Sequence, residues 1–178
     1  MQVFAIVAVL GLTLAAAGSA ERIVTPPLPG FVVGYKAANA EQSIREEVPT
    51  GQTVERWTRM VTTQWFAGLA RRASPAVYVG NVIAGAPSSC PGARPGPVRS
   101  FTIDGRPAAQ FRLDCPRMPS TGLPETFLFL AVAGQADMYV KQVAFRGSYK
   151  PADMDWGLKL LASVRFCAKA SKVPACAG

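Results

Sequence analysis

The sequence predicts an α+β fold in which a mostly antiparallel β-sheet lies between helical layers. Residues 126–133 are continuously apolar, a pattern typical of a strand that is buried on both faces. Around this run, segments with strand-like alternation and segments with helical spacing follow one another in the order ββ, αα, ββββ, α. A central strand that needs cover on both faces, together with helices able to supply it, favours a sheet between helices.

The first twenty residues have the pattern of a cleavable secretory signal peptide. An apolar run over residues 3–17 ends in small residues, which places the expected cut after Ala20. The run is shorter than the roughly 20 apolar residues of a membrane span, so we expect no transmembrane anchor in the mature chain. No Lys or Arg precedes the run, and the alternative is a buried N-terminal helix or strand. The pattern predicts a periplasmic or secreted protein.

The mature chain is expected to have one folded unit after a short lead-in. Residues 21–30 are rich in proline and predict an extended segment. Residues 31–178 have the length of a single α+β domain with its own core. A hydrophobic content of 49% with 17% charged residues indicates a globular chain. Apolar side chains alternate on both sides of Asn39, which predicts a β-hairpin over residues 31–48.

Helical spacing follows this hairpin. Apolar side chains recur at intervals of three and four residues, which predicts a helix over residues 54–72 with Thr53 as its N-cap. Arg71 and Arg72 would close this helix, where cations suit the negative end of the helix dipole.

Two further helices are expected. Ser74 and Pro75 supply the N-cap and first-turn residue of a short second helix, and residues 85–97 are expected to form a loop. The last helix begins after Pro151 and directs Trp156 toward the core.

The most clearly marked hairpin turns at Asp104 and Gly105. A two-residue turn would place Phe101 opposite Ala108, on the polar face of the next strand. We therefore expect a three-residue loop that includes Arg106 and keeps the apolar faces together. Residues 126–133 and 138–146 then form the two remaining strands.

This order of elements resembles the PsbP-like family, the extrinsic P subunit of photosystem II and its relatives, which share an α/β/α sandwich with a nuclear Ran-binding protein. The resemblance is carried by the early hairpin, the helix containing Glu55, Arg56 and Trp57, the long strand pair after the loop, and the closing helix around Trp156. It covers most of residues 31–167. Members of this family are mostly non-catalytic docking or assembly proteins, so the resemblance implies a binding role. It places no binding residue of a named member on this chain.

The chain contains four cysteines. An even number in an exported protein favours two disulfides, and each preferred pair is close in sequence. The other two connectivities are possible, as is a zinc site that would need all four thiolates because the chain has no histidine. The preferred pairs are Cys90–Cys115 and Cys167–Cys176.

The side chains that most often carry catalysis are missing from the sequence. Without histidine, the chain lacks Ser-His-Asp and Cys-His catalysis and the usual histidine metal sites. Glu46 and Glu47 are adjacent on a predicted strand and point to opposite faces. Asp153 and Asp155 lie where they would cap the last helix. We expect no enzymatic activity, no metal and no cofactor.

A formal charge of +8 at pH 7 is the remaining signal. Arginine forks suit phosphate and carboxylate groups, and an exported protein meets both in envelope polymers. The alternative is that these arginines only solvate the surface. Nucleic-acid binding would fit the charge but is not expected of an exported protein. The candidate anion-binding residues are Arg71, Arg72, Arg106 and Arg112.

These observations predict a non-enzymatic exported domain that binds a protein or a component of the cell envelope. One alternative is a binder of anionic polymers that uses an arginine-rich surface. The other is a hydrolase that uses Asp or Glu, which would need two carboxylates roughly 5–9 Å apart in a cleft.

Overall fold

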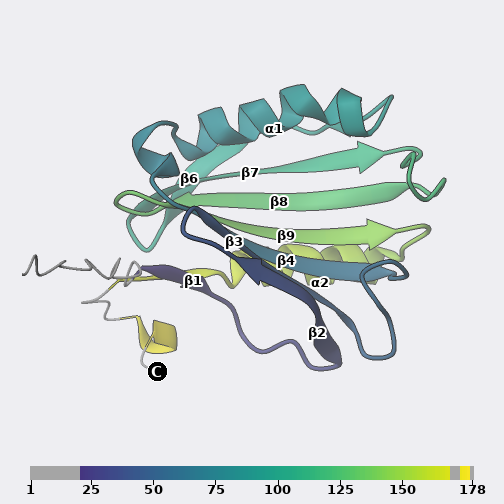
Figure 1. Ribbon diagram of the computed structural model, residues 1–178, viewed down its shortest axis with the longest axis horizontal. Coiled ribbons are helices and arrows are strands. Elements are labelled where there is room, and N and C mark those ends of the chain that lie inside the picture. Colours follow the sequence, from purple (N-terminus) through teal and green to yellow (C-terminus); the bar gives the residue numbers. More distant parts are fainter. Residues whose placement is uncertain (1–20, 169–172, 177–178) are drawn as a thin grey trace, which may run out of the picture.

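The computed structural model describes residues 21–168 and 173–176, so the predicted signal peptide lies outside the described residues. An eight-stranded antiparallel sheet has the order β2-β3-β4-β9-β8-β7-β5, and β6 also pairs with β7 (Figure 1). The expected α+β class with a mostly antiparallel sheet is confirmed. The strands are β2 (Phe31–Ala38), β3 (Gln42–Pro49), β4 (Arg59–Phe66), β5 (Arg94–Pro95), β6 (Arg99–Ile103), β7 (Arg106–Cys115), β8 (Glu125–Ala133) and β9 (Met138–Arg146).

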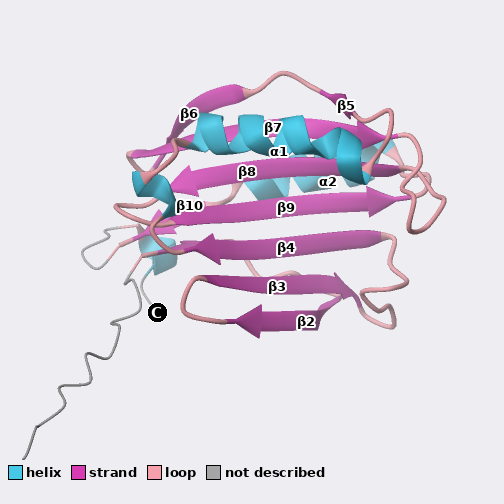
Figure 2. Ribbon diagram, turned by 45° about the horizontal axis from the view of Figure 1, so that its top comes forward, coloured by secondary structure: helices cyan, strands magenta, loops and turns pink. Residues whose placement is uncertain are grey.

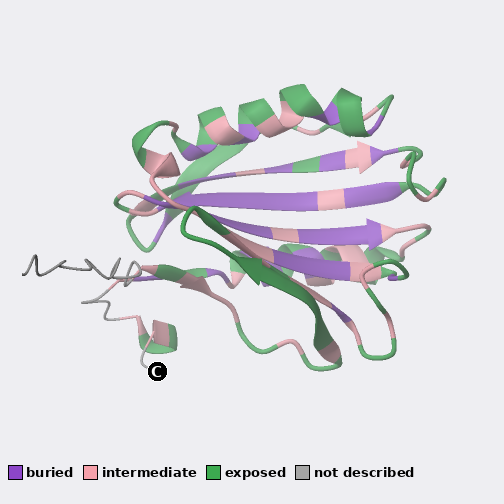
Figure 3. Ribbon diagram, viewed as in Figure 1, coloured by how far each residue is buried: buried purple, intermediate pink, exposed green. Residues whose placement is uncertain are grey.

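One helix lies on each face of the sheet. Helix α1 (Pro75–Ser89) packs on β7 and β8, and helix α2 (Pro151–Ala162) packs on β8 and β9 from the other side (Figure 2). Strand β8 is therefore covered twice, and all of its residues except Phe127 are buried (Figure 3). The continuous apolar run thus forms the doubly covered strand that its pattern predicted.

The predicted helix over residues 54–72 is wrong. Its middle is strand β4, followed by a short 3₁₀ turn, η1 (Leu69–Arg71). Strand β4 contains Val61, Thr62 and Thr63 in succession, and β-branched side chains favour a pleated backbone. It pairs with β3 on one side. On the other side, each of its eight residues pairs with a residue of β9. These non-local hydrogen bonds outweigh the helical spacing of the apolar residues.

Helix α1 is longer than predicted. Ser74 caps it as expected, because its hydroxyl accepts a hydrogen bond of 3.3 Å from the backbone N–H of Val77. The helix continues through Gly85 and Pro87, so residues 85–89 are helical and the loop begins later. Cys90 ends the helix and is joined to Cys115 at the end of β7.

The predicted three-residue loop between β6 and β7 is also wrong. Asp104 and Gly105 form a two-residue turn with φ of 48° and 80°, the pattern that Asp-Gly favours in hairpins. Phe101 consequently lies opposite Ala108 and is 39% exposed. Ile103 takes the buried place instead. The prediction assumed that the aromatic side chain must be buried.

The start of the lead-in, Glu21 and strand β1 (Arg22–Val24), is attached to the rest of the domain. Strand β1 pairs with β10 (Arg165–Cys167), which forms a separate two-stranded sheet. Glu21 forms an ion pair with Arg106, and its carboxylate accepts a hydrogen bond of 2.9 Å from the backbone of Gln135.

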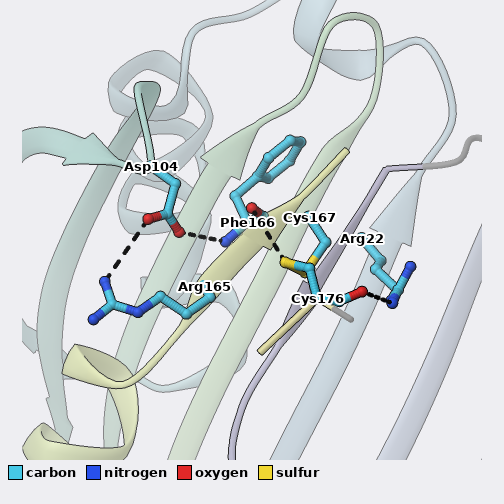
Figure 4. Close-up of a disulfide and its surroundings, with 6 residues drawn as sticks. All are labelled: Arg22, Asp104, Arg165, Phe166, Cys167 and Cys176. Carbon is cyan, nitrogen blue, oxygen red and sulfur yellow. Dashed lines mark hydrogen bonds and ion pairs between the residues drawn. A yellow bond between two sulfur atoms is a disulfide. The ribbon is translucent and has the colours of Figure 1, made fainter. Parts of the chain in front are cut away.

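The C-terminal disulfide ties this second sheet to the last described turn, η2 (Pro174–Cys176). Cys167 is joined to Cys176, and Arg22 donates a hydrogen bond of 3.3 Å to the carbonyl of Cys176 (Figure 4). Asp104 accepts a hydrogen bond of 2.9 Å from the backbone of Phe166. Both disulfides have the pairing predicted from the sequence.

Candidate functional site

Helix α1 covers only part of its face of the sheet. It packs on β7 and β8, and Val79 of α1 belongs to one apolar cluster with Met138 and Val140 of β9, whereas most of β4 and all of β3 and β2 carry no helix on that side (Figure 2). We call this uncovered part the open sheet face. Strand pairing places its central side chains in rows that cross the strands. These side chains are Tyr35, Glu46, Thr62, Gln64 and Gln142.

The main row runs from the sheet edge toward its centre. Tyr35 pairs with Glu46, Glu46 with Thr62, and Thr62 with Gln142. Exposure falls from 47% for Tyr35 to 5% for Thr62, and the last member of the row, Gln142, is half-buried. An aromatic ring at the rim and polar groups toward the floor form a graded surface suited to another macromolecule.

Aromatic side chains form one wall of the open sheet face. Tyr78 projects from α1, with its ring 5.9 Å from that of Phe66 and 6.2 Å from that of Phe129. Burial raises the pKa of the Tyr78 hydroxyl. This wall is rigid because Phe129 also packs against Phe111 at 5.3 Å.

The opposite wall is the irregular segment of residues 50–58. Trp57 is buried against Met60 and Val48, in a small core of its own. Arg146 lies over the Trp57 ring, 3.9 Å from its centre, and donates a hydrogen bond of 2.8 Å to the carbonyl of Glu55. The segment is thereby fixed to the end of β9.

The polar groups of the open sheet face are available for binding. Within the described residues, the side chains of Glu46, Gln64 and Gln142 form no hydrogen bond with protein groups. Partial burial raises the pKa of Glu46 because desolvation disfavours its charged form. A donor from a partner would restore hydrogen bonding that burial has taken from this carboxylate.

The sequence signal for Glu46 lies in the alternation of β3. Glu46 shares its face of the strand with Ile44 and Val48, so a carboxylate stands in an apolar row. The prediction that Glu46 and Glu47 point to opposite faces is confirmed. Glu47 accepts a hydrogen bond of 2.9 Å from Arg45 on the other side of the sheet.

The four arginines predicted as an anion site are not brought together. Arg106 is paired with Glu21 and lies over the ring of Phe166. Arg112 is paired with Asp114 at 2.8 Å. Arg71 and Arg72 are exposed beside a shallow hollow of about 650 Å³ near η1.

The carboxylates of Asp153 and Asp114 have structural partners. Asp153 accepts a hydrogen bond of 2.9 Å from the backbone of Lys150 and so caps α2 as predicted. Asp114 accepts hydrogen bonds from Arg112 and Thr126. Within residues 21–168 and 173–176, no cluster of three or more His, Cys, Asp or Glu side chains could hold a metal ion.

Lys141 is a buried cation on the other side of the sheet. It is 4% exposed, and its Nζ donates a hydrogen bond of 2.8 Å to Thr63. Desolvation lowers its pKa to about 8, partly opposed by Glu47, while Arg45 lowers it further. The buried ammonium group costs stability wherever it remains charged.

We expect the free energy of unfolding to rise with pH between about pH 8 and 9.5 because of Lys141. In this range the unfolded lysine keeps a proton that the folded one has lost, which gives at most about 1.4 kcal/mol per pH unit. Urea denaturation across this range should show a smaller rise for Lys141→Met than for the wild type. An equal rise in both proteins would show that Lys141 does not titrate there.

No family model matches the chain, and no curated protein is similar to it. Among solved structures, the Ran-binding protein Mog1p of Saccharomyces cerevisiae has a TM-score of 0.52 at 8% identity, covering 80% of this chain and 89% of that chain. A Mog1 point mutant gives the same values. A Pseudomonas aeruginosa protein of unknown function has a TM-score of 0.47 at 15% identity, covering 71% and 81%. The Mog1 similarity shows the fold alone.

The PsbP-like assignment is corrected by these findings. The similar structures reported above are those of Mog1 and of a Pseudomonas aeruginosa protein of unknown function, and no family model supports the assignment. One feature that carried it is absent, because Glu55, Arg56 and Trp57 lie in an irregular segment and not in a helix. Neither helix of the described residues is long and apolar enough to cross a membrane.

Proposed function

We propose that this chain is an exported, non-enzymatic domain that binds a protein of the cell envelope through its open sheet face. The observation that carries the proposal is the part of the sheet that α1 leaves uncovered, where unpaired polar groups lie beside exposed apolar ones. Val32 and Tyr35 on β2 are 42% and 47% exposed (Figure 3). Surfaces with an aromatic rim and a desolvated polar centre suit protein partners.

Export is supported by the disulfides and by the apolar leader. Two disulfides within one small chain are typical of proteins that fold in an oxidising compartment. The leader ends in small residues immediately before Glu21, which the structure places in an ion pair with Arg106. Cleavage after Ala20 would leave this anchored residue at the new N-terminus.

A binding role is favoured over catalysis by the shape of the face. Its polar side chains stand on a broad sheet between two walls, and the carboxylate of Glu46 faces solvent without a second carboxylate beside it on its row. Mog1p, whose fold is similar, is described as a Ran-binding protein. A protein partner for this chain is our inference from the face itself.

Site-specific crosslinking in living cells tests this proposal. A photoreactive residue at Tyr35 or Gln142 is expected to give one discrete adduct with an envelope protein. The matched controls are Val77 on the outer side of α1, 54% exposed, and Lys159 on α2. In the same cells, mass spectrometry should find the protein beginning at Glu21. Adducts formed equally from all four positions, or only from the controls, would contradict the proposal.

The contribution of Glu46 to this adduct can be measured separately. Glu46→Ala removes the half-buried carboxylate, and we expect adduct yield from Gln142 to fall about tenfold, the loss of one charge-assisted hydrogen bond. Glu41→Ala is the control because Glu41 is exposed at the edge of β3. An equal yield from the two variants would exclude Glu46 from the interface.

A further inference from the structure

A groove lies on the side of the sheet opposite the open sheet face. It runs between α2 and the strands β6 and β7 and has a volume of about 300 Å³. Volumes of this size are at the lower end of those that hold small molecules. Its walls combine leucines with two arginines. The lining includes Arg99, Gln110, Arg112, Leu128, Leu158 and Leu161.

The apolar part of the groove is open to solvent. Leu128 and Leu161 form its floor and are 3% and 5% exposed. Leu158, on the same helix as the buried Leu161, is 48% exposed. Phe101, 39% exposed, lies on the same face of β6 as Arg99. An exposed leucine on the wall of an apolar groove is the arrangement expected where a hydrocarbon chain binds.

The charged part of the groove has a net positive charge. Arg112 donates hydrogen bonds of 2.8 Å to Asp114 and to the Tyr149 hydroxyl, which fix the orientation of its guanidinium. Arg99 has no ion-pair partner among the residues that the structure describes. Two guanidinium groups and one carboxylate leave a single positive charge. The groove therefore complements a ligand that carries one negative charge.

We propose that this groove binds a single acyl chain with a carboxylate head group, a fatty acid. The hydrocarbon chain lies on Leu128, Leu158 and Leu161. The carboxylate accepts hydrogen bonds from Arg99 and from Nη1 of Arg112, the nitrogen of that guanidinium that donates to neither Asp114 nor Tyr149. The planar guanidinium of Arg99 can match the carboxylate with two parallel hydrogen bonds. The site is independent of the open sheet face, because the sheet separates the two.

Isothermal titration of the mature, disulfide-intact protein with sodium decanoate, below its micelle concentration, tests this assignment. We expect saturable binding with one site per chain. Decyltrimethylammonium, which has a chain of similar length and the opposite charge, is expected not to bind. Decyl phosphate carries more than one negative charge and is expected to bind more weakly. Equal binding of all three amphiphiles, or no binding of decanoate, would overturn the proposal.

Two substitutions locate the site. Arg99→Gln and Leu158→Glu are each expected to weaken decanoate binding at least tenfold. Both residues are exposed, so the variants should retain the wild-type Tm. The controls are Arg72→Gln and Val77→Glu, which make the same changes at exposed positions outside the groove. If decanoate binds Arg99→Gln as tightly as it binds Arg72→Gln, the head group does not lie on Arg99 and the assignment is wrong. Crosslinking from Tyr35 should be unaffected in either variant.

Discussion

Removing the disulfide between Cys90 and Cys115 is expected to lower the free energy of unfolding by about 3.5 kcal/mol, on the chain-entropy estimate for the loop that it closes. The two cysteines are 25 residues apart, and both are buried, at 2% exposure. Their replacement by alanine introduces no unsatisfied polar group. The disulfide joins Cys90, the C-cap of α1, to the end of β7, so its loss also frees one wall of the open sheet face.

The second disulfide provides the matched comparison. Cys167 and Cys176 are 9 residues apart, and the same estimate gives about 2.7 kcal/mol for their loop. Urea denaturation of the two double-alanine variants should therefore rank Cys90/Cys115 as the more destabilised. The reverse order would mean that the attachment of the C-terminal turn to the β1–β10 sheet stabilises the fold by more than loop closure does. Exchange of α1 amide hydrogens should increase only in the first variant.

The sequence predicts well those parts of the fold whose residue pattern is compatible with only one structure. The apolar run of β8 is too continuous for a surface strand and is bounded by turn residues, so only a strand covered twice accommodates it. The sequence around Ser74 and Pro75 starts a helix because both residues fit the first turn and nothing competes. Cysteines close in sequence pair because short loops close at the lowest entropic cost.

Strand β4 shows why the remainder is not predictable from local pattern. Val61 and Trp65 are four residues apart and suit a helix face as well as one side of a strand. The choice is made by β3 and β9, whose exposed backbone groups need a partner that only β4 supplies. Without that pairing, β-branched content is the only local signal for a strand, and the apolar spacing favours a helix.

The open sheet face was missed for a related reason. Its residues come from four strands, the first and last of which are about a hundred positions apart in the sequence, and their meeting depends on the strand order. Once the helix over residues 54–72 is replaced by β4, one predicted helix is missing and part of a sheet face is left uncovered. The wrong helix therefore removed the candidate site from the prediction. The carboxylate of Glu46 in an apolar row was the single visible trace.

Replacing Arg146 with methionine is expected to lower the free energy of unfolding by about 3–5 kcal/mol, the usual cost of breaking a buried ion pair. Arg146 donates a hydrogen bond of 2.7 Å to Glu125, and the two side chains are 14% and 4% exposed. Methionine would fill the volume but leave the Glu125 carboxylate buried without its partner. The hydrogen bond to Glu55 and the contact with the Trp57 ring would be lost as well.

A double-mutant cycle separates the cost of the unpaired Glu125 charge from the loss of the contacts that Arg146 makes with residues 50–58. Glu125→Gln combined with Arg146→Met removes the unpaired charge, so stability should recover by more than half of the loss. Arg112→Met, which breaks an exposed pair with Asp114, should cost no more than about 1 kcal/mol. If Arg146→Met costs no more than Arg112→Met, Arg146 does not hold residues 50–58 in place.

The readout that links this ion pair to binding is the fluorescence of Trp57, measured with Trp65 and Trp156 replaced by phenylalanine so that Trp57 is the one tryptophan left. If the charge pair alone matters, the double variant regains both stability and the wild-type emission. If Arg146 also holds the wall of the open sheet face, stability returns while Trp57 emission stays shifted, because no cation covers the ring. We expect the second result, since the guanidinium of Arg146 contacts the segment through both the ring and the Glu55 carbonyl. Crosslinking from Tyr35 should then fall in the double variant although it is folded.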